Sequence, residues 1–140
     1  MPSAANYGTR SYRPLVSLTY ALEVRALGNS PIALHFFDML LHAAAAVLLA
    51  LLLGELIPGS RWVVPVAALF AVHPVLSEAV CSIVGRADLM ASVALLGMLV
   101  LHLKARRARA PWLHEGGALL CLAAALLSKE YAVGFPFVLV

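Results

Sequence analysis

Charge is scarce in this chain of 140 residues: charged residues make up 12% of it, whereas 63% are hydrophobic. A soluble domain carries roughly a quarter charged residues, so the composition excludes a soluble globule and indicates a membrane protein. Cysteine is also scarce. Cys81 lies in a short polar connection and Cys121 inside an apolar run, which argues against a disulfide framework and leaves the redox compartment open. The first thirteen residues have no apolar core of the signal-peptide type.

Long apolar segments predict an all-α polytopic membrane protein with about four transmembrane helices. Ser30-Pro31 is typical of a helix start, with a capping hydroxyl before a proline. As a helix, the apolar stretch that follows would be about 30 Å long, the thickness of a bilayer core. We expect a loop segment over residues 1–31 and a helical bundle over 32–140. Its spans are expected at about 32–53, 62–84 (with a break at His73-Pro74), 89–103 and 112–128, with the start of another at 135–140.

Basic residues are concentrated between the third and fourth expected spans. Four of the ten lie within six positions, namely Lys104, Arg106, Arg107 and Arg109. A short basic loop beside apolar spans is typical of the cytosolic side of a membrane, and not of a nucleic-acid-binding patch. Alternation of the spans then places three segments together on the opposite side: residues 1–31, His73–Asp88 and Lys129-Glu130.

Five short motifs follow one another along the chain: Ser11-Tyr12-Arg13-Pro14-Leu15, Phe70-Ala71-Val72-His73-Pro74-Val75, Glu78-Ala79-Val80, Gly85-Arg86-Ala87-Asp88 and Ser128-Lys129-Glu130. On these motifs the sequence resembles the transmembrane and tetratricopeptide-repeat protein O-mannosyltransferases, which are GT-C glycosyltransferases. The resemblance implies part of a GT-C helical bundle in the endoplasmic reticulum membrane. It also implies that the chain is an N-terminal membrane-domain fragment without the tetratricopeptide repeats, and inactive alone.

The resemblance further implies the reaction of the full-length protein, which is transfer of mannose from dolichyl phosphate mannose to Ser or Thr hydroxyls of proteins in the lumen. The expected partners are that donor, an acceptor protein and membrane lipids, with no nucleic acid. No cofactor and no metal is assigned. Another GT-C enzyme that uses a different lipid-linked sugar is a close alternative.

Three basic residues are candidates for binding the lipid-linked phosphate: Arg86, Arg13 and Lys129. A guanidinium can meet a phosphate with two parallel hydrogen bonds and stays charged, and a helix that begins near Gly85 would add the positive end of its dipole beside Arg86. Alternatively, Arg86 extends to lipid headgroups or pairs with a carboxylate. Arg13 would otherwise anchor its loop at the headgroups, and Lys129 would form a turn at the membrane edge.

Glu78 and Asp88 are the candidate catalytic carboxylates. Mannosyl transfer with inversion requires a base that removes the proton of the acceptor hydroxyl. Each carboxylate also has a structural alternative, because each falls at the start of an expected helix. There it would interact favourably with the helix dipole and accept hydrogen bonds from the free N–H groups. In the resembled family the base would be an acid of the first lumenal loop. Asn6-Tyr7-Gly8 stands about where that acid is expected, and no Asp or Glu precedes Glu23.

Histidines provide two further candidates. His35, Asp38 and His42 have the spacing of one helix face, which is compatible with a metal but more typical of a polar stripe that faces the interior of a bundle. His73, before a proline at a helix break, indicates a structural role. A functional alternative of another class is a transporter or non-catalytic assembly subunit. A transporter should show paired repeats with broken helices, and the two halves show no convincing repeat.

Overall fold

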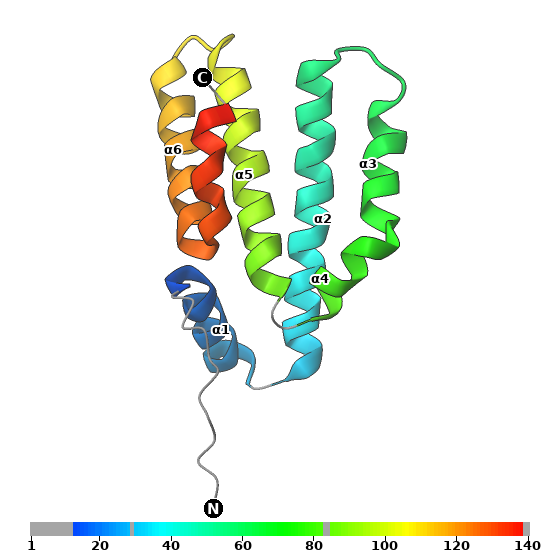
Figure 1. The fold of residues 1–140 in the computed structure, drawn as a ribbon, viewed down its shortest axis with the longest axis vertical. Helices are drawn as coiled ribbons and strands as arrows, with labels where there is room; N and C mark the ends of the chain where they lie inside the picture. The colour runs from blue at the N-terminus through cyan, green and yellow to red at the C-terminus, as the bar shows by residue number, and fades with distance from the viewer. Residues whose placement is uncertain (1–12, 29, 83–84, 139–140) are drawn as a thin grey trace, which may run out of the picture.

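The computed structural model describes residues 13–28, 30–82 and 85–138. Over these residues the chain is helical and contains no strand (Figure 1), which confirms the all-α fold class. The elements are α1 (Pro14–Leu27), α2 (Pro31–Leu56), α3 (Val63–Val72), the 3₁₀ segment η1 (Pro74–Leu76), α4 (Ser77–Cys81), α5 (Arg86–Ala105), α6 (Pro111–Ser128) and the 3₁₀ segment η3 (Glu130–Val138).

Three of the described helices, α2, α5 and α6, are long and apolar enough to cross a membrane. The segment made of α3, η1 and α4 would be a fourth span, bent by 49°. The bend lies at His73-Pro74, where His73 has an extended backbone. A proline disfavours the α conformation in the residue before it, so the sequence itself ends α3 at this point. The described residues therefore contain three to four candidate spans, which is consistent with a polytopic membrane protein.

Proline begins most of the longer helices. Pro14, Pro31 and Pro111 occupy the first position of α1, α2 and α6, where the missing N–H costs nothing and the fixed φ favours the helix. The Ser30 hydroxyl, expected as a cap, makes no capping hydrogen bond. The region 1–31, predicted as a loop, contains the 14-residue helix α1. The apolar positions of α1 are interspersed with hydroxyl residues, and this masked its helical pattern.

Small residues hold α5 against α6. Ala91 and Ala125 are fully buried, and a side chain at Gly117 would come within 3.1 Å of Leu101 Cδ1. Small residues allow the backbones of membrane helices to approach closely. Close packing therefore fixes the position of α5, and with it the residues of its first turn.

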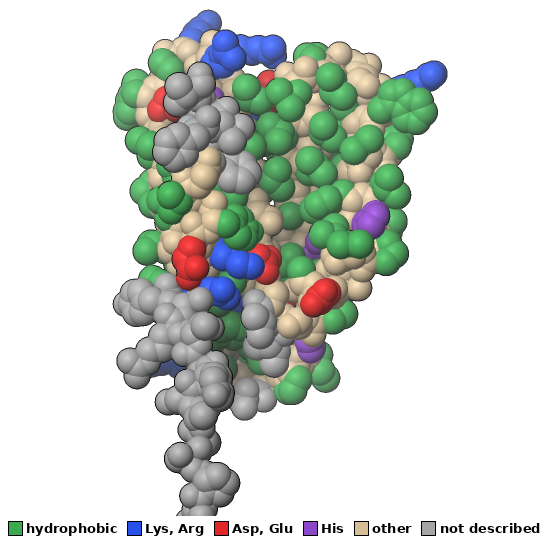
Figure 2. Space-filling view, viewed as in Figure 1, with side chains coloured by type: hydrophobic (Ala, Val, Ile, Leu, Met, Phe, Trp, Pro, Cys, Tyr) green, Lys and Arg blue, Asp and Glu red, His purple; other side chains and the backbone are tan. Residues whose placement is uncertain are grey.

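The connections lie at two opposite ends of the bundle. Figure 1 shows the α2–α3 and α5–α6 connections at one end, and α1, α4 and the start of α5 toward the other. At the first end an ion pair 3.5 Å long joins Arg107 Nη1 to Glu55 Oε2, and Figure 2 shows basic side chains along this edge. The candidate site segments lie toward the second end, hereafter the α4–α5 end. Which end faces the cytosol stays a prediction.

Candidate functional site

Arg86, the first residue of α5, is completely buried. Its guanidinium binds two carboxylates: Nη1 lies 2.5 Å from Glu23 Oε2, and Nε lies 2.6 Å from Asp38 Oδ1. Nη2 also donates a 2.9 Å hydrogen bond to the Leu34 carbonyl oxygen. Arg86 therefore joins three helices, α1, α2 and α5, and we refer to Arg86, Glu23 and Asp38 as the arginine cluster.

Two aromatic rings contact the same guanidinium. Its carbon lies 4.0 Å from the ring centroid of Tyr20 and 4.9 Å from that of Phe37, which are cation–π distances. Burial raises the pKa of the Tyr20 phenol above its usual value of 10.0; the charge of Arg86 opposes this shift, and the carboxylates of Asp38 and Glu23 add to it.

The arginine cluster bears on the predicted phosphate contact of Arg86. Pairing with carboxylates was the structural alternative, and this is the arrangement observed. Because the side chain is fully buried, a phosphate could reach it only after α1 or α2 moved. Phosphate binding by Arg86 stays a prediction.

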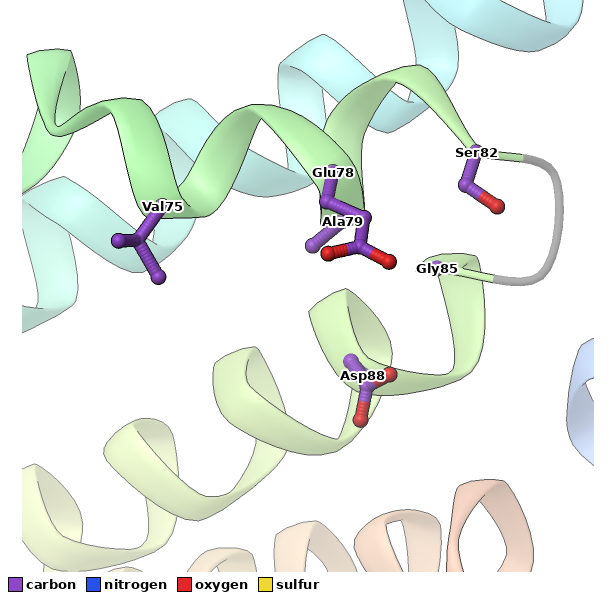
Figure 3. Close-up of a pocket in the computed structure, with 6 residues that line it drawn as sticks. All are labelled: Val75, Glu78, Ala79, Ser82, Gly85 and Asp88. Atoms are coloured by element: carbon purple, nitrogen blue, oxygen red, sulfur yellow. The ribbon is translucent and has the colours of Figure 1, made fainter.

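A pocket of about 350 Å³ opens where α4 meets the first turn of α5. Figure 3 shows the Glu78 carboxylate extending from α4 toward α5, and Asp88 on the facing turn. The start of α5 lies close to the backbone of α4 because residue 85 is a glycine. A Cβ at Gly85 would lie 2.7 Å from the carbonyl carbon of Ala79. Both predicted catalytic carboxylates therefore line one pocket, and Glu78 is exposed in it.

Lys129, the residue after α6, is connected to this pocket through Asp88, one of the residues that line it. Its ammonium pairs with Asp88 Oδ1 and lies 5.2 Å from the ring centroid of Tyr131. Burial raises the pKa of the Tyr131 phenol above 10.0, and the Asp88 carboxylate raises it further. The structure thus brings together Glu78, Asp88 and Lys129, which the sequence had proposed separately. We refer to these three residues as the charged pocket.

The remaining candidates have mostly structural contacts. His73 Nδ1 accepts a hydrogen bond from the Val75 N–H at 3.3 Å, which caps η1. His42 Nε2 contacts the Ala71 carbonyl oxygen at 3.0 Å and its ring stacks on Phe70. Among the described residues, no three His, Cys, Asp or Glu side chains are placed to hold a metal ion. Arg13, at the start of α1, has its Nε buried without a hydrogen-bond partner in the described part of the chain, and Asn6-Tyr7-Gly8 lies outside that part.

The chain is similar to proteins named protein O-mannosyl-transferases. Protein O-mannosyl-transferase Tmtc1 of Drosophila melanogaster is 37% identical over 123 residues, which is 88% of this chain and 14% of that protein. Human protein O-mannosyl-transferase TMTC2 is 35% identical over 128 residues, 89% of this chain and 15% of its own length. Human TMTC3 is 31% identical over 137 residues, 94% of this chain and 14% of its own length. The chain belongs to the TMTC family. It spans about one seventh of the length of these relatives. No family model and no solved structure matches it.

Two residues of this TMTC-family site were missed as partners of Arg86. Glu23 stood in a segment expected to be a loop, and Asp38 was considered only with the histidines of its own helix. One signal was available for Asp38, because a carboxylate within an apolar span usually pairs with an opposite charge. Nothing in the sequence indicates that this charge comes from a residue 48 positions away.

Proposed function

We propose that the full-length protein transfers mannose to Ser or Thr hydroxyls of acceptor proteins, and that this chain is part of its membrane domain. The observation that carries the proposal is the match of 88% of the chain to proteins named protein O-mannosyl-transferases. The charged pocket supports the proposal, because a carboxylate can accept a proton from a hydroxyl and an ammonium can bind a phosphate at the same end of a membrane bundle. No observation favours a transporter or assembly subunit.

We propose dolichyl phosphate mannose as the donor and the endoplasmic reticulum membrane as the location. A lipid-linked sugar phosphate presents an anion at the membrane surface, and cations at the α4–α5 end can stabilise it as it leaves. Lys129 is more accessible than Arg86, since its side chain is 24% exposed whereas that of Arg86 is 0% exposed. Arg13, with its unpartnered Nε, is a second candidate.

Glu78 is the better placed of the two carboxylates to accept a proton from the acceptor hydroxyl. The Asp88 carboxylate is held by Lys129, so its role is to position that ammonium. Glu78 is exposed in the pocket, and no ion pair is formed by it within the described residues. A general base contributes about 10²- to 10⁴-fold to a rate.

Mannosyl transfer by the full-length protein tests the assignment. We expect Glu78→Gln to lower kcat by about 10²-fold or more, because the amide cannot accept the proton. Glu55→Gln is the matched control: it removes a carboxylate at the opposite end, where Glu55 pairs with Arg107, and should leave kcat unchanged. Equal rates for both variants would remove Glu78 from the reaction, and absence of transfer by the wild-type protein would remove the proposed function.

The phosphate role of Lys129 has a separate readout. We expect Lys129→Gln to raise the KM for the donor by about tenfold, since a hydrogen bond to a charged group contributes about 1.5–3 kcal/mol. The KM for an acceptor peptide should stay the same, because the ammonium would contact only the phosphate. A change confined to the acceptor would assign Lys129 to the other substrate.

A further inference from the structure

A second cavity, separate from the charged pocket, lies between α1 and α2. Its volume is about 420 Å³, within the range of small-ligand sites, and its lining is almost entirely apolar. Leu22 and Leu27 line it from α1, and Ala33, Phe36 and Leu40 from α2. Leu22, Leu27 and Phe36 are each more than half exposed, so the cavity is a groove open at its rim.

Glu23 brings a charged group to the lining of this groove. Its side chain is only 7% exposed. Oε2 binds Arg86, but Oε1 is buried and has no hydrogen-bond partner in the part of the chain that the structure describes. A buried carboxylate oxygen without a donor costs about 1–3 kcal/mol or more, so its presence beside a cavity indicates a ligand that donates to it.

The charge of the arginine cluster shows which kind of donor fits. One guanidinium faces two carboxylates, Glu23 and Asp38, so the buried cluster carries one formal negative charge in excess. A buried charge without compensation is strongly destabilising. The complementary ligand therefore presents a cationic group with an N–H to donate, and continues into an apolar body that fills the groove.

The length of α2 favours a lipid as the ligand of the groove. The 26 residues of α2 make a helix about 39 Å long at about 1.5 Å per residue, whereas the bilayer core is about 30 Å thick. The first turns of α2, which line the groove, can therefore lie at the headgroup level, where ammonium groups are found. We propose that the groove between α1 and α2 binds a phospholipid with a primary ammonium headgroup, phosphatidylethanolamine, whose N–H donates to Glu23 Oε1.

Native mass spectrometry of the full-length protein tests this site. The protein is released from nanodiscs that contain equal amounts of phosphatidylethanolamine and phosphatidylcholine with the same acyl chains. Both headgroups are cationic at nitrogen, but only the first has N–H groups. We expect about tenfold preferential retention of phosphatidylethanolamine, as a charge-assisted hydrogen bond provides. Equal retention of the two lipids overturns the proposal.

Three variants locate the site. Ala33→Phe adds an aromatic ring to the lining of the groove and leaves the three residues of the arginine cluster unchanged, and should abolish the preference. Val64→Phe adds the same ring at an exposed position of α3 and should leave it intact. Glu23→Gln keeps an oxygen for Arg86 but removes the excess charge, and should reduce the preference with the thermal midpoint unchanged or raised. A preference that survives Ala33→Phe overturns the proposal, as does a wild-type protein that retains no lipid because other helices of the full-length chain cover the groove.

Discussion

The ion pairs of Arg86 are the most consequential contacts of a single residue in this chain. A buried ion pair adds little stability compared with an apolar replacement, but removal of one partner leaves the other charge buried and costs about 3–5 kcal/mol. Arg86→Ala leaves two carboxylates, those of Glu23 and Asp38, buried without their cation. We expect it to lower the stability of the full-length protein in detergent by at least this amount, measured by thermal or denaturant unfolding.

Arg107→Ala is the control for this prediction, because it removes an arginine whose side chain is 71% exposed. Exposed ion pairs contribute about 0–1 kcal/mol, so this variant should unfold almost as the wild type does. A combined replacement, Arg86→Met with Glu23→Gln and Asp38→Asn, should recover most of the loss since no charge stays buried. Equal stability of Arg86→Ala and wild type would contradict the buried cluster.

For single residues, the sequence could point to the candidate residues but not to their partners. Arg86, Asp88, Glu78 and Lys129 stood out because ionisable side chains are rare in an apolar chain. Their pairing depends on tertiary structure: Arg86 meets carboxylates 48 and 63 residues away, and Lys129 meets Asp88 over 41 residues. A charge specifies the sign of its partner and not its position in the chain.

Among the elements, the close approach of α4 to the start of α5 at Gly85 determines the geometry of the charged pocket. A Cβ at Gly85 would lie well inside contact distance of the Ala79 backbone, and backbone cannot yield as a flexible side chain does. Gly85→Ala should therefore separate α4 from α5 and move Glu78 away from Asp88. We expect a loss of both thermal stability and mannosyl transfer in the full-length protein.

Gly116→Ala is the matched control, since a Cβ at Gly116 meets no atom within 4 Å. This glycine lies inside α6, where alanine stabilises a helix by about 0.5–1 kcal/mol. The control should unfold at the same or a higher temperature and keep full transfer. A Gly85→Ala protein that behaves in the same way would show that α4 and α5 do not depend on this close approach.

The elements also differ in how well their sequences predict them. Two local signals agree for the helices that begin at Pro31 and Pro111: a proline at the first helical position and a long apolar run after it. For α1 the first signal is present at Pro14, but the apolar residues that follow form only a short patch. Burial of Val16 and Glu23 stabilises α1, and the second of these depends on Arg86. A helix whose buried face includes a paired charge has no clear apolar periodicity.

For the whole molecule, the predicted topology has a direct test in the native cysteine Cys81, which is exposed at the α4–α5 end. Arg109→Cys places a thiol in the α5–α6 connection at the opposite end, in a background with the native cysteines replaced by serine. In sealed microsomes, whose cytosolic face is outward, a membrane-impermeant maleimide should label position 109 at once, because short basic loops stay in the cytosol. Cys81, tested with Cys121→Ser, should react only after detergent opens the membrane. If both positions react in sealed vesicles, the charged pocket does not face the lumen and could not meet a lumenal acceptor; if neither does, the basic connection is not cytosolic.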